Sequence, residues 1–397
     1  MIAEKLRRAF VSFCVILCLV TQKLALHLAG FEFSLVIFIF PVLMLGLFFL
    51  HQIRVNSGRL FMFCIVAFLS AVSFLVNIYS SGLTSYVYFL ILYLFLCFDF
   101  PLSDDIRGTV VSTVRVVLIG SAFIGIAQFM GQLAGLKYVD IFDMVPEQFK
   151  LSGFNTYYPL FYGSRIIKSN GWLYLEPSFF SQFMALGILI ELSLSGKRLG
   201  AREITRIAIY GVGLICSFSG TGILILLFFF IPALRKISPS RRIIIILGMI
   251  VVFILFAASE YADAIFRRVS EFGSNSSSAA IRFINPYKEA FHPADGKTFF
   301  FGVGAGRSIV GTRLQSNHNA VTKVMIEYGF FCLLAFIVYI WKVFNRNGVS
   351  VFSIGVIFMF LFLSGSLLQP SILLPLFFLI ELIRPRESVV IKGVSAE

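Results

Sequence analysis

Runs of about 20 predominantly apolar residues recur along nearly the whole chain, and this feature restricts the fold most strongly. A helix of that length is what crossing the hydrocarbon core of a bilayer requires. Hydrophobic residues make up 58% of the 397 residues and charged residues only 13%, whereas an ordinary soluble domain has about 25% charged residues. We therefore predict an all-α, polytopic membrane protein that forms one integral-membrane domain over residues 1–397.

The apolar runs predict about twelve transmembrane helices. The least secure pair is 203–218 and 220–235, because both are short and only Ser219 separates them. The Gly and Ser residues at this break favour a tight re-entrant turn whose polar groups face protein or a water-filled cavity. The expected spans are residues 9–28, 33–52, 59–79, 83–100, 108–130, 177–195, 203–218, 220–235, 241–259, 318–341, 349–367 and 370–384.

Lys and Arg are concentrated in the connections on one side of these spans. The short connections on the opposite side, near residues 29–32, 80–82, 219 and 368–369, contain none. The positive-inside rule then puts both termini in the cytoplasm and the two long loops, 131–176 and 259–317, outside. In a bacterial inner membrane these would be two large periplasmic loops. The net charge of +13 is dispersed among short loops, so we expect membrane lipids and no nucleic acid as partners.

The two outer loops carry the candidate site residues. Guanidinium groups bind phosphate oxygens through a planar fork, and a neutral imidazole can take a proton from a hydroxyl near neutral pH. Such a set suits attack by a sugar hydroxyl on a carbon whose leaving group is pyrophosphate, but also a hydrolase or a pyrophosphate-binding transporter. The candidates are Arg165, Lys168, Glu176, Arg267, Arg268, Arg282, Lys288, Arg307, Arg313 and His318.

Structural alternatives exist for the main candidates. His318 stands where the second outer loop re-enters the bilayer, so it could cap the following helix or lie at the interface. Arg282 could be a solvated charge or form a salt bridge in the loop. Glu176 precedes Pro177, a favoured first helical residue, so its carboxylate could be stabilised by a helix N-terminus.

Aromatic residues surround Arg165 and Lys168 in the first outer loop, where they could stack on sugar rings or form an interfacial belt. The GVGAGR segment (302–307) lacks a following Lys-Ser/Thr and a βαβ context, so we interpret it as a flexible loop and not as a nucleotide site. The sequence contains no HExxH or CxxC motif and no His cluster, and we expect no metal and no cofactor.

Several segments resemble the O-antigen polymerase and O-antigen ligase superfamily. SNHNAVTKVMIEYGFFCLLAF (316–336) is similar to the segment that follows the large periplasmic loop there, in which a His–Asn pair opens a helix and an acidic residue and Gly follow, here Glu327 and Gly329. Further similar segments are NGWLYLEPSFFSQFMAL (170–186), the SGTG break (219–222), Arg282 with the aromatic stretch after it, and FFGVGAGR (300–307).

The resemblance implies a membrane-embedded, GT-C-type glycosyltransferase that acts on undecaprenyl-pyrophosphate-linked oligosaccharides without a metal or a nucleotide sugar. By position, it carries a catalytic role over to His318 and pyrophosphate binding to Arg282 and Arg165. From the residues themselves, we add Lys168 as a rival for pyrophosphate binding and Glu176 as a second candidate for catalysis. Asn317 and Asn319 flank His318 and could support it by orienting its ring or the sugar. Many relatives have an Arg beside the Ser–Gly turn, and this chain does not, so that residue's role does not transfer.

The expected function is polymerisation of an O-antigen, exopolysaccharide or capsule, by inverting transfer of the growing glycan to a lipid-linked repeat unit, with a chain-length regulator protein as a further partner. An O-antigen ligase acting on lipid A core is one alternative, and a lipid-linked oligosaccharide flippase or transporter is another. A proton-coupled transporter would bury carboxylates near mid-membrane, whereas the charges inside spans here are predicted to reach an end by snorkelling. These are Lys23, Arg115, Glu191 and Glu381.

Overall fold

The computed structural model describes most of the chain and shows it to be mostly helical, as predicted. It describes residues 2–28, 31–50, 53–161, 163–195, 199–226, 243, 278–293, 295–308, 316–345, 351–363 and 367–382. Most of the expected spans 220–235 and 241–259, and the start of the second outer loop, lie outside these residues, as do Arg267, Arg268 and Arg313.

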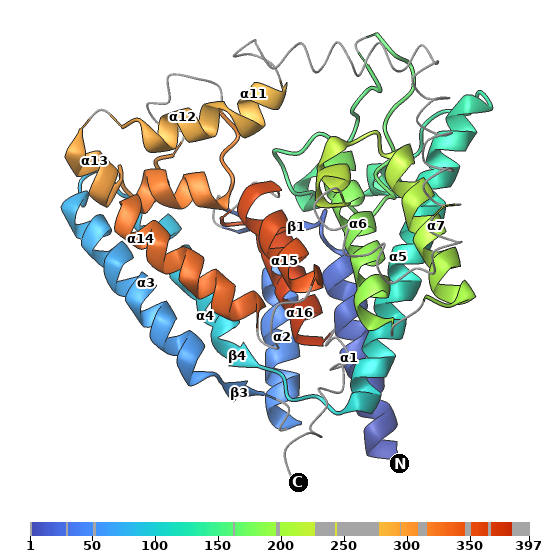
Figure 1. The fold of residues 1–397 in the computed structure, drawn as a ribbon, viewed down its shortest axis with the longest axis horizontal. Coiled ribbons are helices and arrows are strands. Elements are labelled where there is room, and N and C mark those ends of the chain that lie inside the picture. Colours follow the sequence, from blue (N-terminus) through green and yellow to red (C-terminus); the bar gives the residue numbers. More distant parts are fainter. Residues whose placement is uncertain are drawn as a thin grey trace.

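The helices follow one another with few strands between them (Figure 1). They are α1 (Ile2–Val20), α2 (Val36–Phe49), α3 (Ser57–Val76), α4 (Leu83–Leu94), α5 (Asp104–Leu133), α6 (Pro177–Leu194), α7 (Ala201–Cys216), α11 (Ser278–Phe283), α12 (Asn285–Phe291), α13 (Gly296–Phe301), α14 (Ala320–Phe344), α15 (Val351–Phe358) and α16 (Pro370–Leu382). Short 3₁₀ segments are η1 (Phe95–Cys97), η2 (Ile141–Met144) and η3 (Glu147–Phe149), and η5 (Met359–Leu363) is a π-helical turn.

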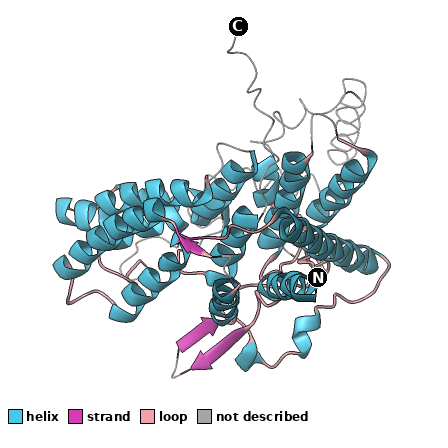
Figure 2. Ribbon diagram, turned by 90° about the horizontal axis from the view of Figure 1, so that it is seen from below, coloured by secondary structure: helices cyan, strands magenta, loops and turns pink. Residues whose placement is uncertain are grey.

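Two antiparallel strand pairs complete the fold, and Figure 2 shows how short they are beside the helices. Strand β1 (Ala25–Leu28) pairs with β2 (Phe31–Ser34), and β3 (Arg54–Val55) pairs with β4 (Phe98–Asp99). The first pair corrects the expected span 9–28, because α1 ends at Val20 and the chain then turns into a hairpin before α2.

Among the described residues, four helices are long and apolar enough to cross a membrane: α3, α5, α6 and α14. Shorter apolar helices occur at residues 36–49, 83–97, 352–363 and 370–381. On α3, Phe61, Phe68 and Leu75 form a stripe of side chains that are 64–67% exposed. Such an apolar outer face suits hydrocarbon better than water. These helices are consistent with a membrane protein, whereas the count of twelve spans stays a prediction.

The described parts of both predicted outer loops lie at the same end of the molecule. Helices α11, α12 and α13 cross that end above α3 and α14, and the connection from α5 to α6 lies there as well (Figure 1). Helix α1 starts at the opposite end.

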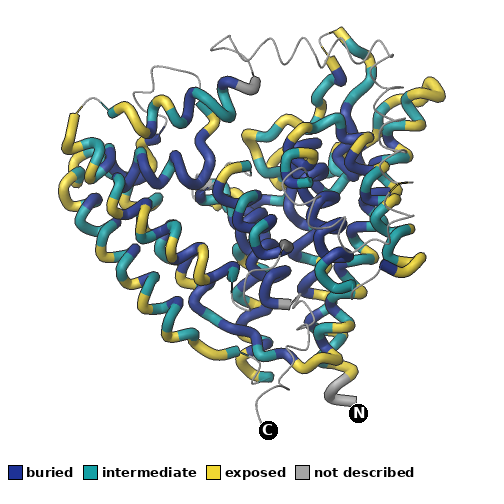
Figure 3. The backbone as a smooth tube through the Cα atoms, in the orientation of Figure 1, coloured by how far each residue is buried: buried dark blue, intermediate teal, exposed yellow. Residues whose placement is uncertain are grey.

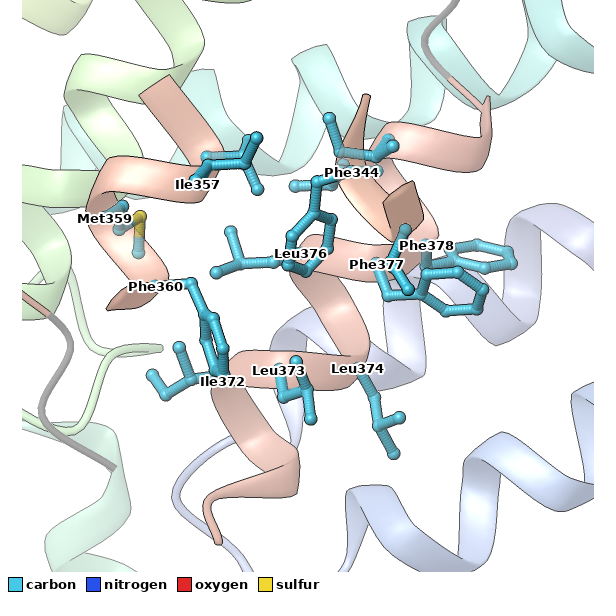
Figure 4. Packing of buried hydrophobic residues seen from close by; sticks show 14 of the residues in the cluster. Phe344, Ile357, Met359, Phe360, Ile372, Leu373, Leu374, Leu376, Phe377 and Phe378 are labelled. Atoms are coloured by element: carbon cyan, nitrogen blue, oxygen red, sulfur yellow. The ribbon is translucent and has the colours of Figure 1, made fainter. Parts of the chain in front are cut away.

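The core runs through the middle of the molecule, where the backbone in Figure 3 is coloured as buried. Helix α6 is buried along nearly its whole length. Around the C-terminal helices, the rings of Phe344 of α14 and Phe360 of η5 lie 5.9 Å apart, and Ile372 and Phe377 of α16 belong to the same buried cluster (Figure 4). This packing holds α14, η5 and α16 together below the candidate site.

Several charged side chains in this core form ion pairs between helices. Arg59 lies 2.6 Å from Glu381 and 3.0 Å from Asp99, and all three are buried. Glu191 binds Arg115 at 2.7 Å and Arg206 at 2.9 Å. Lys23 pairs with the buried Asp140. Pairing across helices offsets the cost of desolvating these charges. That they lie within reach of an end of their spans stays a prediction.

The break between α7 and the next helical residues occurs where it was predicted, at Ser217–Ser219. Gly222 lies against α6 so closely that a Cβ there would be 2.4 Å from the Ser181 carbonyl oxygen. Thr221 Oγ1 donates to the Ser178 carbonyl at 3.1 Å. The break therefore supports the start of α6.

Helix α14 is kinked at Gly329, where φ is +82° and ψ is −179°. The carbonyl groups released by the kink accept hydrogen bonds from the GVGAGR segment: Val303 N–H donates to Ile326 at 2.8 Å and Gly304 N–H to Glu327 at 3.1 Å. Arg307 donates to the Ser80 carbonyl. The prediction of a flexible GVGAGR loop is therefore wrong, because this segment fastens α13 to α14.

Replacing Gly329 by Ala should destabilise the protein by about 2–5 kcal/mol, since only Gly adopts this backbone region and overpacking adds to the strain. A Cβ there would lie 2.2 Å from the Phe300 carbonyl oxygen. Thermal unfolding in detergent, followed by the fraction that elutes as monodisperse protein, measures the loss. Gly120→Ala in α5 is the control, because nothing lies within 4 Å of its added Cβ. Equal midpoints for both variants would contradict the role of Gly329.

Candidate functional site

A cavity of about 270 Å³ lies where α6, α11, α14 and η5 meet. It brings together five residues that the sequence singled out, and they come from both predicted outer loops. Its lining consists of Gly153, Phe154, Glu176, Ser178, Phe179, Arg282, Phe283, Ser308, Ser316, Asn317, His318, Asn319, Lys323, Phe362, Leu363 and Gln369.

His318 occupies the position just before the cap of α14 and is only 7% exposed. The cap itself is Asn319, whose side-chain oxygen accepts from Thr322 N–H at 3.0 Å. His318 is therefore not the helix cap, and its ring is left to face the cavity. Nε2 lies 3.5 Å from Glu289 Oε2 of α12, and neither ring nitrogen has a well-aligned hydrogen bond within the part of the chain that the structure describes.

Burial lowers the pKa of His318 below its ordinary value of 6.5, because desolvation disfavours the imidazolium. The Glu289 carboxylate raises this pKa, Lys323 lowers it, and the Ser308 backbone raises it, with a net lowering. His318 is therefore mainly neutral at pH 7. A neutral imidazole is the form that can accept a proton.

Asn319 joins three elements around His318. Its amide nitrogen donates to the Tyr287 hydroxyl of α12 at 2.9 Å and to the Phe362 carbonyl of η5 at 3.4 Å. The amide thus supports the wall of the cavity. Asn317 donates its backbone N–H to the Ile281 carbonyl at 2.9 Å, which ties the approach to α14 to α11, while the residue itself lines the cavity.

Glu176 and Arg282 form the opposite wall. Arg282 Nη2 lies 3.4 Å from Glu176 Oε2, and Ser178 Oγ donates to the same oxygen at 3.0 Å. Glu176 directly precedes α6, with Pro177 in the first turn as predicted, but its side chain makes no capping hydrogen bond. Arg282 thus forms a long salt bridge with Glu176 and also lines the cavity.

Arg165 and Lys168 are not part of this lining. The chain turns back on itself between Tyr158 and Lys168, and Pro159 forms an antiparallel bridge with Ile167. This hairpin leaves Arg165 exposed and buries Lys168, whose Nζ lies 5.7 Å from the centre of the Tyr158 ring. Lys288 is exposed on α12, also outside the lining.

Two charged residues near the cavity were missed from the sequence, Lys323 and Glu289. Lys323 lines the cavity from the start of α14. Its i, i+4 spacing from Asn319 puts both on one helix face and could have identified it. Glu289 approaches His318 only because α12 folds over the start of α14, which no local pattern encodes.

No protein-family model matches the chain, and no curated protein matches its sequence significantly. The resemblance to the polymerase and ligase superfamily stays a prediction, and the functional inference rests on the cavity. Within the described residues, no group of three or more His, Cys, Asp or Glu side chains could hold a metal ion.

The titration midpoint of His318 should lie below 6.5, and two variants should move it in opposite directions. Lys323→Gln removes a positive charge and should raise the midpoint, whereas Glu289→Gln removes a negative charge and should lower it. NMR of histidine-labelled protein in nanodiscs measures both shifts. The chain has four histidines, and His318→Gln assigns the signal. A midpoint above 6.5 would contradict the account of a desolvated, neutral ring.

Proposed function

We propose that this protein is a membrane-embedded glycosyltransferase that polymerises a polysaccharide. It transfers a growing glycan from undecaprenyl pyrophosphate to a hydroxyl of a lipid-linked repeat unit. The observation that carries the proposal is the cavity in which a buried, neutral His318 and the guanidinium of Arg282 face the same space.

The lining of the cavity supports an amphiphilic substrate. One part is polar or charged, and includes Glu176, Arg282 and His318. The other part is apolar, formed by Phe154, Phe179, Phe283, Phe362 and Leu363. A lipid with a pyrophosphate and a sugar at its end has both kinds of surface, whereas a free sugar nucleotide does not need the apolar part.

The position of the cavity along the helices supports a substrate held at the bilayer surface. Helices α6 and α14 are both long and apolar enough to cross a membrane. Glu176 and Asn319 are the residues at which these two helices begin, and both line the cavity. A polyprenyl chain can then stay in lipid while its pyrophosphate and sugar reach polar groups.

In the proposed reaction, His318 takes the proton from the acceptor hydroxyl as its oxygen attacks the anomeric carbon of the donor glycan. The bond between that carbon and the pyrophosphate oxygen breaks, and undecaprenyl pyrophosphate leaves as an anion. The anomeric configuration inverts. Arg282 offsets the charge that develops on the leaving oxygen, and the imidazolium afterwards releases its proton to water.

Glu176 is the weaker candidate for the base. Its carboxylate already accepts from Ser178 and pairs with Arg282, and proton transfer to it would weaken that pair. We assign it instead to positioning the Arg282 guanidinium. His318 lies near Glu289 and the Ser308 backbone, but burial keeps its pKa low and its ring neutral, which favours it as the base.

For the membrane, we propose the bacterial inner membrane, with both termini in the cytoplasm and the cavity on the periplasmic face. The clustering of the described outer-loop segments at one end of the molecule supports this orientation (Figure 1). The Lys and Arg bias supports it independently.

Reporter fusions test this topology. Because the positive-inside rule sets orientation, fusions at residues 150 and 290 should report the periplasm and a fusion at residue 200 the cytoplasm. A phosphatase and a fluorescent reporter at each position give opposite readouts and control for expression. A cytoplasmic signal at residue 290 would reverse the orientation and remove the cavity from the periplasmic face.

Removing the base should abolish most of the polymerisation. His318→Gln keeps hydrogen bonding but cannot accept a proton at neutral pH, so the rate should fall about 10²- to 10⁴-fold. Purified protein reconstituted with lipid-linked repeat units gives the rate, with product length read on a gel. His292→Gln is the matched control, since this exposed histidine near the end of α12 does not line the cavity.

The outcomes also separate the alternatives. Near-normal polymer from His318→Gln would exclude this residue as the base. A wild-type protein that moves glycan onto lipid A core but never lengthens it would be a ligase. Movement of intact lipid-linked oligosaccharide across a vesicle membrane, without a new glycosidic bond, would identify a flippase.

A further inference from the structure

Lys323 is the second cation of the cavity, and the start of a helix is an unfavourable place for its charge. It lies in the first turns of α14, five residues after His318, and its side chain is 20% exposed. A positive charge near a helix N-terminus is unfavourable, because the macrodipole there is also positive. Lys323 also lowers the pKa of His318, which means that the cation destabilises a protonated neighbour.

The only acid paired with Lys323 among the described residues is a poor partner. Lys323 Nζ lies 3.8 Å from Glu327 Oε1, beyond the length of a hydrogen bond. Lys placed four residues before Glu is also the weaker of the two orders of such a helical pair. Lys323 therefore offsets the charge of the buried Glu327 only at a distance, and its ammonium group can bind a further anion in the cavity.

The lining of the cavity suits such an anion. Arg282 on α11 and Lys323 on α14 reach the same space from different elements, and Ser308, Ser316 and Gln369 add hydrogen-bonding groups to its lining. The acid partners of both cations are loosely placed, since Arg282 lies 3.4 Å from Glu176. An anion with two phosphate groups could contact both cations at once, and charge-assisted hydrogen bonds of this kind are the strong ones.

We propose that Lys323, together with Arg282, binds the pyrophosphate of a polyprenyl-pyrophosphate lipid, an inference that rests on the proposed function. Arg165 and Lys168, which the sequence suggested for this role, lie outside the cavity lining. Lys323 also couples donor binding to proton transfer. Without the anion, its charge keeps His318 neutral and able to accept a proton; with the anion bound, that charge is offset, and the imidazolium that forms in the reaction is less disfavoured.

The test measures binding of farnesyl pyrophosphate to purified full-length protein in detergent by calorimetry. Lys323→Gln should weaken binding about 10- to 100-fold, since it removes a hydrogen bond between charged groups. Lys323→Arg keeps the charge and should restore most of the affinity. Arg165→Gln is the matched control: it removes the same charge from an exposed position outside the cavity lining, and should leave the affinity unchanged.

Two further ligands define what the site recognises. Farnesyl monophosphate should bind more weakly than the pyrophosphate, because it carries less negative charge and fewer phosphate oxygens for the two cations. Inorganic pyrophosphate should bind more weakly than farnesyl pyrophosphate, because it does not use the apolar part of the lining. Equal affinity for inorganic pyrophosphate would assign the site to the free anion and overturn the lipid part of the proposal.

Binding and polymerisation assays together separate the role of Lys323 from the proposed polymerase activity. Polymer made by the wild type, with unchanged farnesyl pyrophosphate binding in Lys323→Gln, would overturn the role of Lys323 alone. Specific loss of binding in Lys323→Gln, with no polymer formed by the wild type, would support the pyrophosphate site and overturn polymerisation. If both stand, the acidic limb of the polymerisation rate should move to higher pH in Lys323→Gln, because the pKa of His318 rises when Lys323 loses its charge.

Discussion

Charged groups inside an apolar helical bundle are stable only when they are paired. The packing of this protein depends on ion pairs that join its helices. Arg59 binds Glu381 at 2.6 Å, and Glu191 binds Arg115 at 2.7 Å. These pairs connect α3 with α16, near opposite ends of the chain, and α5 with α6, across the first outer loop. Breaking one partner of such a buried pair leaves an uncompensated charge, at a cost of about 3–5 kcal/mol. The pairs therefore help to hold the frame against which the cavity is built.

The charges of the cavity are held more loosely than those of the frame. Arg282 lies 3.4 Å from Glu176, His318 lies 3.5 Å from Glu289, and Lys323 lies 3.8 Å from Glu327. A cation at such a distance from its acid can exchange that partner for a substrate anion at small cost. A buried imidazole without a well-aligned hydrogen bond is likewise ready to accept a proton. The contrast between tight structural pairs and loose cavity pairs is what the proposed transfer reaction needs.

The sequence predicted much of this arrangement where local pattern decides it, and less where distant elements decide it. The start of α6 at Pro177, and the meeting of His318, Arg282 and Glu176, followed from hydropathy, loop placement and a family resemblance. The hairpin that takes Arg165 and Lys168 out of the cavity lining depends on backbone pairing inside one long loop. The kink at Gly329 and the approach of Glu289 to His318 depend on how α12 and α13 pack on α14, and no periodicity carries that information.

The proposed reaction requires that the lipid pyrophosphate bind in the cavity beside His318. Cryo-electron microscopy of the protein in nanodiscs with a lipid-linked oligosaccharide tests it most directly. We expect pyrophosphate density in contact with Arg282 and Lys323. The anomeric carbon of the donor should lie on the His318 side, and the polyprenyl chain should lie along Phe362 and Leu363. Pyrophosphate density beside Arg165 and Lys168, or at the end of the molecule where α1 starts, would contradict it.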